Sequence, residues 1–263
     1  MVSANSLACG VSRIVFPGIV FLLPPRMISD WLSDVKAEAE VESSNTVGYQ
    51  KIQLTVGFNM ISPAFNEIGG NIKAIKNIFE EKTGWTAGEA DSEADYIYIW
   101  HNGGYAYTYF VSSDADGAWA NGEESFSETE DQLPENVGFW LYNRGSARTV
   151  TLAGEVPTED AVISIIPGFT MVSNPFAAPI PVKSIAATSG EFVAGEADSE
   201  ADYIYIWRNG GYDATYFVSS DADGAWANGE ESFSETEDTI APGEAFWFYR
   251  RGSAMTITIP CPN

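Results

Sequence analysis

The sequence predicts an all-β protein made of two tandem, homologous domains of the β-sandwich or β-barrel type, with one short helix in the first. Three observations predict this architecture. The 45-residue segment Ala87–Asp131 recurs as Ala194–Asp238 with three differences. Short runs rich in Tyr, Ile, Val and Trp alternate with Gly, Asn and Pro, as strands alternate with turns. The copies lie 107 residues apart, beyond the roughly 20–50 residues of solenoid repeats, so whole domains are repeated.

Both copies contain the same succession of strand-like runs. A hairpin is predicted around His101–Gly104, because Asn and Gly tolerate the positive φ angles of tight turns. In the first copy we expect strands at Val47–Leu54, Phe58–Ser62, Tyr96–Trp100, Tyr105–Val111, Phe139–Tyr142 and Thr149–Leu152. Their counterparts in the second copy include Ala161–Ile165, Phe246–Tyr249 and Thr256–Ile259.

One segment has helical periodicity. Between Asn71 and Glu81, the apolar residues Ile72, Ile75, Ile78 and Phe79 follow one another at helix-like spacings. The matching stretch of the second copy is four residues shorter and rich in Pro, Ala and Ser, so we expect at most one turn there.

The repeat sets the expected domain boundaries. Residues 45–156 form the first copy, and residues 161–260 form the second. The linker Glu155–Asp160 is too short to hold the copies far apart, so we expect them to touch.

Residues 1–44 are interpreted as a leader or N-terminal extension. Arg13 precedes the apolar run Ile14–Leu23, which has the size of a signal-peptide core and is shorter than the roughly 20 residues of a membrane span. We therefore expect no transmembrane span and an extracellular or cell-surface location, although the leader is atypical. The alternative is an irregular extension that buries a small apolar patch.

The charge excludes several partners. The chain has 13 basic and 37 acidic residues, a net charge of −24. Nucleic acid is therefore not an expected partner, because phosphate binding needs clustered Lys and Arg.

The two cysteines, Cys9 and Cys261, are too few for a disulfide scaffold or a Cys-rich zinc site. The single histidine, His101, is replaced by Arg208 in the second copy, which argues against histidine catalysis.

The pattern resembles a group of uncharacterised exported bacterial proteins with tandem, aromatic-rich β modules. The resemblance implies secretion or surface display, a short leader and one or two modules, and it implies no particular chemistry. It rests on the runs Asn45–Ile52, Gly57–Ile61, Ile97–Trp100 with its Asn-Gly-Gly turn, Thr151–Val156 and Pro242–Phe248.

The acidic loop Ser113–Glu123, repeated as Ser220–Glu230, is a candidate calcium site. Its Asp, Asn and Glu side chains are the hard oxygen ligands that Ca²⁺ prefers. The spacing is not that of an EF-hand, so the alternative is a solvated loop with turn-forming Asp and Gly. The candidate ligands are Asp114, Asp116, Asn121, Glu123, Asp221, Asp223, Asn228 and Glu230. Further ligands, or only further charge, could come from Asp91, Glu93, Asp95, Asp198, Glu200 and Asp202.

The tryptophans fall into two groups. Trp100, Trp140 and their counterparts lie in apolar strands, so we expect them in the core. Trp119 and Trp226 lie in the acidic loops, so we expect them to be exposed and able to stack on the C–H faces of sugars. Extracellular glycan is therefore a candidate partner.

These patterns favour a non-enzymatic secreted or cell-surface protein with a structural or adhesive role. Acidic residues are too common for any carboxylate pair to indicate catalysis, and no nucleophile elbow, phosphate loop or zinc signature is present. One alternative is a calcium- or carbohydrate-binding module. A further alternative is a self-associating filament or surface-layer subunit that pairs through exposed strand edges.

Overall fold

The structure is a computed structural model that describes residues 46–66, 68, 73–81, 83–101, 103–111, 118–121, 129, 131–197, 199–218, 225–228 and 235–262. Within these ranges the chain is all-β, with several antiparallel sheets and no α-helix. The predicted leader, residues 1–44, lies outside the described residues. No described helix has the length and apolar character that crossing a membrane requires.

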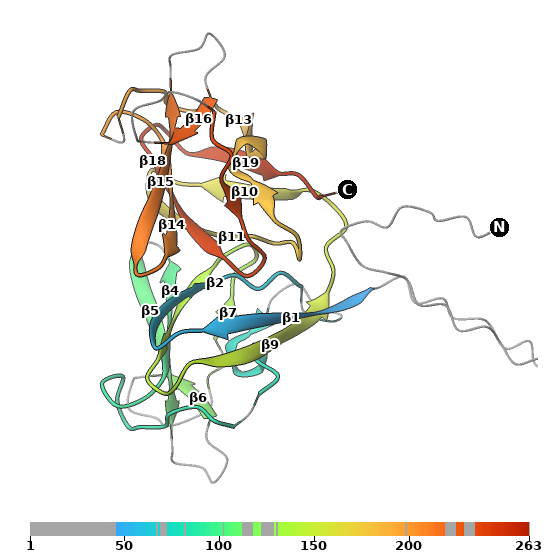
Figure 1. The fold of residues 1–263 in the computed structure, drawn as a ribbon, viewed down its shortest axis with the longest axis vertical. Helices are drawn as coiled ribbons and strands as arrows, with labels where there is room; N and C mark the ends of the chain where they lie inside the picture. The colour runs from blue at the N-terminus through green and yellow to red at the C-terminus, as the bar shows by residue number, and fades with distance from the viewer. Residues whose placement is uncertain are drawn as a thin grey trace, which may run out of the picture.

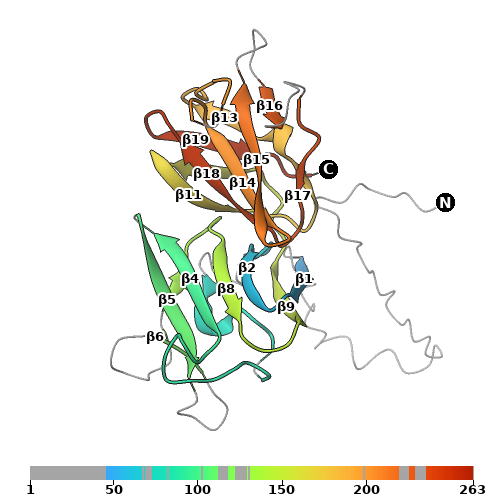
Figure 2. The ribbon, with the colours of Figure 1, turned by 60° about the vertical axis from the view of Figure 1, so that its left-hand side comes forward.

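Each half of the chain contains a five-stranded antiparallel sheet, and the two sheets have equivalent strand orders (Figures 1 and 2). The order is β2-β8-β4-β5-β6 in the first half and β11-β18-β14-β15-β16 in the second. The first sheet comprises β2 (Gly57–Ile61), β4 (Tyr96–His101), β5 (Gly104–Val111), β6 (Ala118–Asn121) and β8 (Phe139–Asn143). The second comprises β11 (Gly168–Ser173), β14 (Tyr203–Arg208), β15 (Gly211–Val218), β16 (Ala225–Asn228) and β18 (Ala245–Arg250).

Smaller sheets complete each half. β1 (Val47–Leu54) pairs with β9 (Arg148–Glu155), and β10 (Ala161–Ile165), β19 (Met255–Ile259) and β13 (Ala186–Ser189) form a three-stranded sheet. Two-residue strands pair as β3 (Lys73–Ala74) with β7 (Gln132–Leu133) and as β12 (Ile180–Pro181) with β17 (Thr239–Ile240). The predicted strands are thus confirmed, with ends shifted by a few residues, whereas β3, β6, β7, their counterparts and β13 were not predicted.

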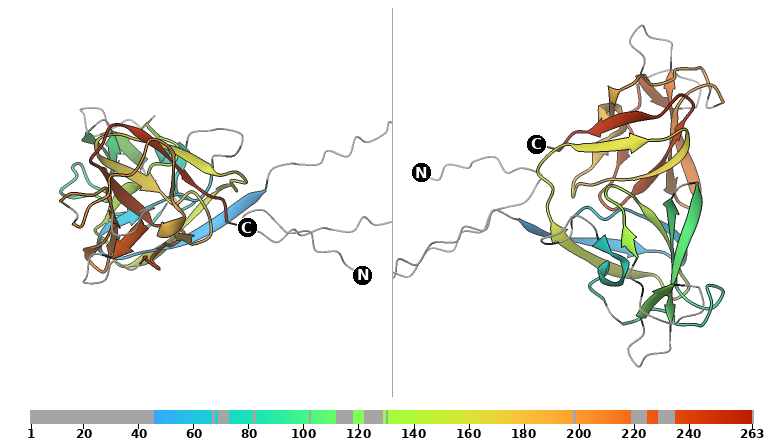
Figure 3. Two further views of the ribbon diagram at one scale, coloured as in Figure 1. Left: turned by 90° about the horizontal axis from the view of Figure 1, so that it is seen from above. Right: turned by 180° about the vertical axis from the view of Figure 1, so that it is seen from behind.

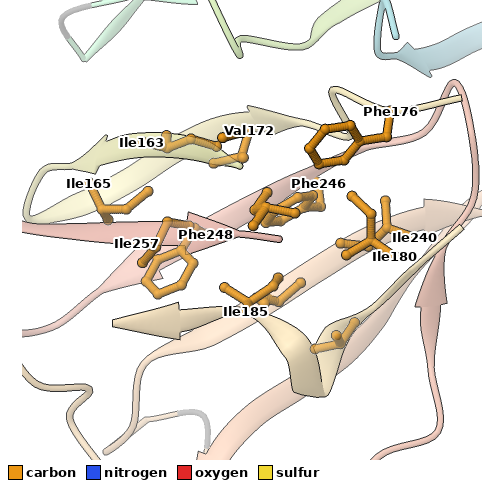
Figure 4. Packing of buried hydrophobic residues seen from close by; sticks show 14 of the residues in the cluster. Ile163, Ile165, Val172, Phe176, Ile180, Ile185, Ile240, Phe246, Phe248 and Ile257 are labelled. Carbon is orange, nitrogen blue, oxygen red and sulfur yellow. The ribbon is translucent and has the colours of Figure 1, made fainter. Parts of the chain in front are cut away.

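The core of each half lies between the five-stranded sheet and the smaller sheet beside it. In the first half, Leu54, Val150 and Leu152 pack in one cluster with Ile97 and Leu141 of the larger sheet. Figure 4 shows the equivalent packing in the second half, in which Ile163 and Ile257 belong to one buried cluster with Phe246 and Phe248. The apolar side chains come from alternate positions of each strand, as expected for sheets with one face buried.

The predicted helix at residues 71–81 is not found in the described part of that segment, residues 73–81. Strand β3 is followed there by a single 3₁₀ turn, η2 (Ile75–Asn77). The Ile75 N–H donates a 3.0 Å hydrogen bond to the Asp131 carbonyl, which ties the segment to the residue before β7. The buried Ile75 and Ile78 are three residues apart, a spacing that a 3₁₀ turn satisfies as well as an α-helix. The second copy has a similar turn, η3 (Val182–Ser184), the one turn expected there.

The two halves contact each other directly, as the short linker predicted, and residues 156–160 join them at one side (Figure 3). The Ser62 N–H donates to the Gly243 carbonyl, and the Ser173 N–H donates to the Asn136 carbonyl, each over 2.9 Å. Ser62 matches Ser173 in the repeat, and Asn136 matches Gly243. The same contact is therefore made twice with the copies exchanged, as in an interface with twofold symmetry.

Candidate functional site

The two tryptophans predicted to be exposed are buried, so that prediction is wrong. Trp119 is 5% exposed and Trp226 is 2% exposed. The segment expected to be a loop continues the sheet as β6 or β16, and strand alternation turns each indole inward. Trp119 packs against Phe110 of the neighbouring strand, with ring centroids 5.3 Å apart. The Trp226 indole N–H donates to the Ile185 carbonyl over 3.4 Å.

The structure does not place most of the predicted calcium ligands. Asn121 and Asn228 are the last residues of β6 and β16. The described residues contain no group of three or more His, Cys, Asp or Glu side chains that could hold a metal ion. The calcium site stays a prediction, because its other residues, Asp114, Asp116, Glu123, Asp221, Asp223 and Glu230, lie outside the described residues.

Two carboxylates of the repeated acidic run are structural rather than available to a ligand. Asp95 and Asp202 are both 0% exposed. Asp95 accepts hydrogen bonds from the backbone N–H groups of Thr86 and Arg144, both over 2.7 Å. Asp202 accepts the equivalent bonds from Val193 and Arg251 at 2.9 and 2.7 Å. Each carboxylate therefore fastens the acidic run to the end of its five-stranded sheet.

The outward side of each five-stranded sheet carries a set of aromatic rings, here called the aromatic face. In β4, Ile97 and Ile99 enter the core cluster of the first half, while the alternate residues project from the opposite side. The repeated letters Tyr-Ile-Tyr-Ile-Trp produce this division in both copies. The face is formed by Phe58, Tyr96, Tyr98, Trp100, Tyr105, Tyr107, Tyr109, Trp140 and Tyr142, and by Phe169, Tyr203, Tyr205, Trp207, Tyr212, Tyr216, Trp247 and Tyr249.

The strand tryptophans pack where the two aromatic faces meet. Trp140 and Trp247 are buried, as expected, but in a separate cluster that joins the two halves and not in the core between sheets. Trp100 and Trp207 are partly buried against that cluster. The Trp100 indole N–H also donates to the Phe169 carbonyl of the other copy over 3.0 Å.

Two grooves lie on this joined aromatic face, with volumes of about 250 Å³ and about 300 Å³. The first groove is lined by Trp100, Tyr105, Phe169, Tyr205, Tyr212 and Trp247. The second groove is lined by the repeat equivalents of these six residues, which are, in the same order, Trp207, Tyr212, Phe58, Tyr98, Tyr105 and Trp140. Every lining residue is aromatic. Tyr105 and Tyr212 border both grooves and are 47% and 46% exposed.

The hydroxyls of Tyr98 and Tyr105 remain protonated at neutral pH. Burial raises the pKa of Tyr105 above its ordinary value. The pKa of Tyr98 is also raised, first by burial and then by the nearby negative charge of Asp91, whose Oδ2 accepts a 3.3 Å hydrogen bond from the Tyr98 hydroxyl. The grooves therefore offer ring faces for stacking and neutral hydroxyls for hydrogen bonds. Among the described residues, none that lines a groove carries a carboxylate, a thiol or an imidazole.

The differences between the copies lie close to this region. Arg208 donates to both carboxylate oxygens of Glu244, at 3.0 and 2.6 Å, and lies 3.9 Å from Asp213. The first copy has His101, Val137 and Ala106 at the positions of Arg208, Glu244 and Asp213. Arg208 and Asp213 therefore differ from the first copy together, and they form an ion pair with each other. The third difference, Tyr107 in place of Ala214, adds one exposed ring to the aromatic face of the first copy.

The fold and the site define an all-β protein with two equivalent aromatic grooves where the halves of a repeat meet. No protein-family model, no curated protein and no solved structure matches the chain. The function must therefore be inferred from the geometry of the aromatic face.

Proposed function

We propose that the chain is a non-catalytic adhesive protein of the extracellular space or cell surface, built of two homologous β domains, that binds glycan through its aromatic face. One observation carries the proposal. In two grooves of equivalent composition, all the described lining residues are aromatic, and Tyr105 and Tyr212 are half exposed between them.

Aromatic rings of this kind suit sugars because a pyranose has an apolar C–H face and a rim of hydroxyls. Tyr combines a flat ring with a hydroxyl at its edge, so it can stack on the C–H face and hydrogen-bond the rim. The grooves have the concave, mostly apolar character of ligand sites. Exposed rings kept in water without a partner would be unfavourable, and their repetition in both copies supports a role in binding.

Two equivalent grooves on one chain also support an adhesive role. A molecule that engages two sugar units at once gains avidity from the second contact, because the second event is intramolecular.

The proposal is tested by binding to a panel of soluble and insoluble polysaccharides, measured by affinity electrophoresis and pull-down. The double variant Tyr105→Ala and Tyr212→Ala removes two rings from each groove and should weaken binding by about tenfold or more, since tenfold corresponds to about 1.4 kcal/mol. The matched control is Tyr49→Ala. Tyr49 is a 72%-exposed ring on β1, outside both grooves, and its loss should leave binding unchanged. Binding of no glycan, or equal losses in both variants, would contradict the proposal.

A further inference from the structure

Building on the proposed glycan binding, we infer that the grooves select cationic sugars, in which the ammonium group of an amino sugar lies against the open aromatic rings. The inference depends on three features of the described residues: the cations already held by the aromatic face, the composition of the grooves, and the charge around them.

The aromatic face already holds guanidinium groups of the chain's own arginines, on rings that do not line the grooves. The guanidinium carbon of Arg144 lies 4.9 Å from the ring centroid of Tyr142 and 5.9 Å from that of Tyr96. In the second copy, the guanidinium carbon of Arg251 lies 5.0 Å from the ring centroid of Tyr249. Both distances to the nearer ring are within the roughly 6 Å of an effective cation–π contact. The same sheet surface therefore holds a cation in each copy.

The groove end of the face has the same kinds of ring but no cation of its own. Within the described residues, neither groove is lined by Lys or Arg. The negative ring faces of Tyr105 and Tyr212 are therefore open to a cation that a ligand brings. A neutral sugar would gain the stacking contact alone, whereas an ammonium sugar would also gain the attraction of the ring quadrupoles.

The charge of the protein favours the same ligand. The net charge of −24 attracts cations over long range and repels uronate, sulfate and phosphate groups. A carboxylate also lies next to the second groove, because Asp91 accepts the hydrogen bond of Tyr98, which lines that groove. Anionic glycans are thus disfavoured, and a sugar that carries a positive charge is favoured over its neutral counterpart.

The test compares two ligands that differ in one group: oligomers of glucosamine, and the same oligomers with every amine acetylated. Affinities for the full chain are measured by isothermal titration calorimetry at low and high salt. We expect the glucosamine oligomer to bind about tenfold tighter or more at low salt. The difference should shrink at high salt, because screening weakens charge attraction at exposed sites. Equal affinities would overturn the inference and leave the proposed glycan binding intact. Failure of both oligomers and of the whole polysaccharide panel would overturn both.

A pair of double variants separates ring electrostatics from apolar contact. Tyr105→Leu with Tyr212→Leu keeps apolar side chains in the grooves but removes the two half-exposed rings, and it should reduce the preference for the ammonium oligomer. Tyr105→Phe with Tyr212→Phe keeps the rings and should retain that preference, whatever affinity the lost hydroxyls cost. Unchanged thermal unfolding of both variants would show that the fold is kept, as expected for half-exposed positions. A preference that survives the leucine substitutions undiminished would overturn the inference.

Discussion

Trp100 and Trp247, which belong to different copies of the repeat, pack edge to face with ring centroids 5.5 Å apart and planes at 87°. Trp207 and Trp140, their repeat equivalents, make the same contact at 5.4 Å and 80°. Edge-to-face pairs at these distances stabilise a contact beyond their buried area. The four indoles therefore hold the halves together and at the same time form walls of the two grooves.

Substitution Trp247→Ala should destabilise the protein by about 3–5 kcal/mol, the usual cost of truncating a buried aromatic residue. Trp247 lies in the cluster that joins the halves and is 6% exposed. The free energy of unfolding is measured by urea denaturation, with Tyr49→Ala as the exposed control that should change it little. A stability like that of the unsubstituted chain would show that the indole pairs do not hold the interface.

Substitution Gly138→Ala should destabilise the contact between the copies by about 1–3 kcal/mol through overpacking. A Cβ at Gly138 would overlap the Cβ of Ala245, its repeat equivalent in the other half. The double variant Gly138→Ala with Ala245→Gly moves the glycine to the other copy and should recover most of the loss. Thermal unfolding of the single and double variants measures the coupling, and simple additivity would contradict this account.

Substitution Arg250→Ala should cost about 3–5 kcal/mol, because it leaves a buried carboxylate without its charged partner. Arg250 is 4% exposed and forms an ion pair with Asp202, which is fully buried. The comparison variant is Lys183→Ala, which breaks the exposed pairs with Glu235 and Glu237 and should have little effect. Urea denaturation at neutral pH measures both. Similar losses in the two variants would show that burial does not set the cost.

The protein should lose stability between pH 10 and about pH 12. Burial, together with smaller contributions from the neighbouring Tyr98 and Tyr142, raises the pKa of Tyr96 from 10.0 to about 12. In this window the unfolded chain loses the phenolic proton and the folded chain keeps it. The free energy of unfolding therefore falls as the pH rises. The protonated Tyr96 makes its full contribution to that free energy only below pH 10.

Urea midpoints measured from about pH 9 to about pH 12 test this expectation, together with the tyrosinate absorbance of the folded protein. The variant Tyr96→Phe cannot titrate at this position, so its stability should fall less steeply. An identical decline in the variant would rule out Tyr96 as the cause.

Most strands could be predicted from the sequence because their signals are local. Val47–Leu54 and Ala161–Ile165 coincide with β1 and β10, since β-rich runs bounded by turn residues are recognisable without knowledge of their partners. The helix prediction failed because apolar residues three and four apart also fit a short strand followed by a 3₁₀ turn. In that segment, the hydrogen bond from Ile75 to Asp131 decided the outcome.

The candidate site was predictable only in part. The alternation in Tyr96–Trp100 does separate aromatic from aliphatic positions, and this signal could have indicated an aromatic sheet face. The prediction for Trp119 was wrong because the segment around it has the composition of a loop. Pairing with β5 makes this segment a strand and turns the indole inward. Such pairing depends on residues distant in sequence.

The sequence by itself determined the duplication, the all-β class and the two-residue period that gives Tyr96–Trp100 and Tyr203–Trp207 an aliphatic and an aromatic side. Only the tertiary structure decided which side faces the core and what covers the other. Burial of a strand face depends on the sheet that packs against it. The grooves exist only because the two copies meet about a twofold relationship, bringing Tyr105 and Tyr212, 107 residues apart, to the border of the same two grooves.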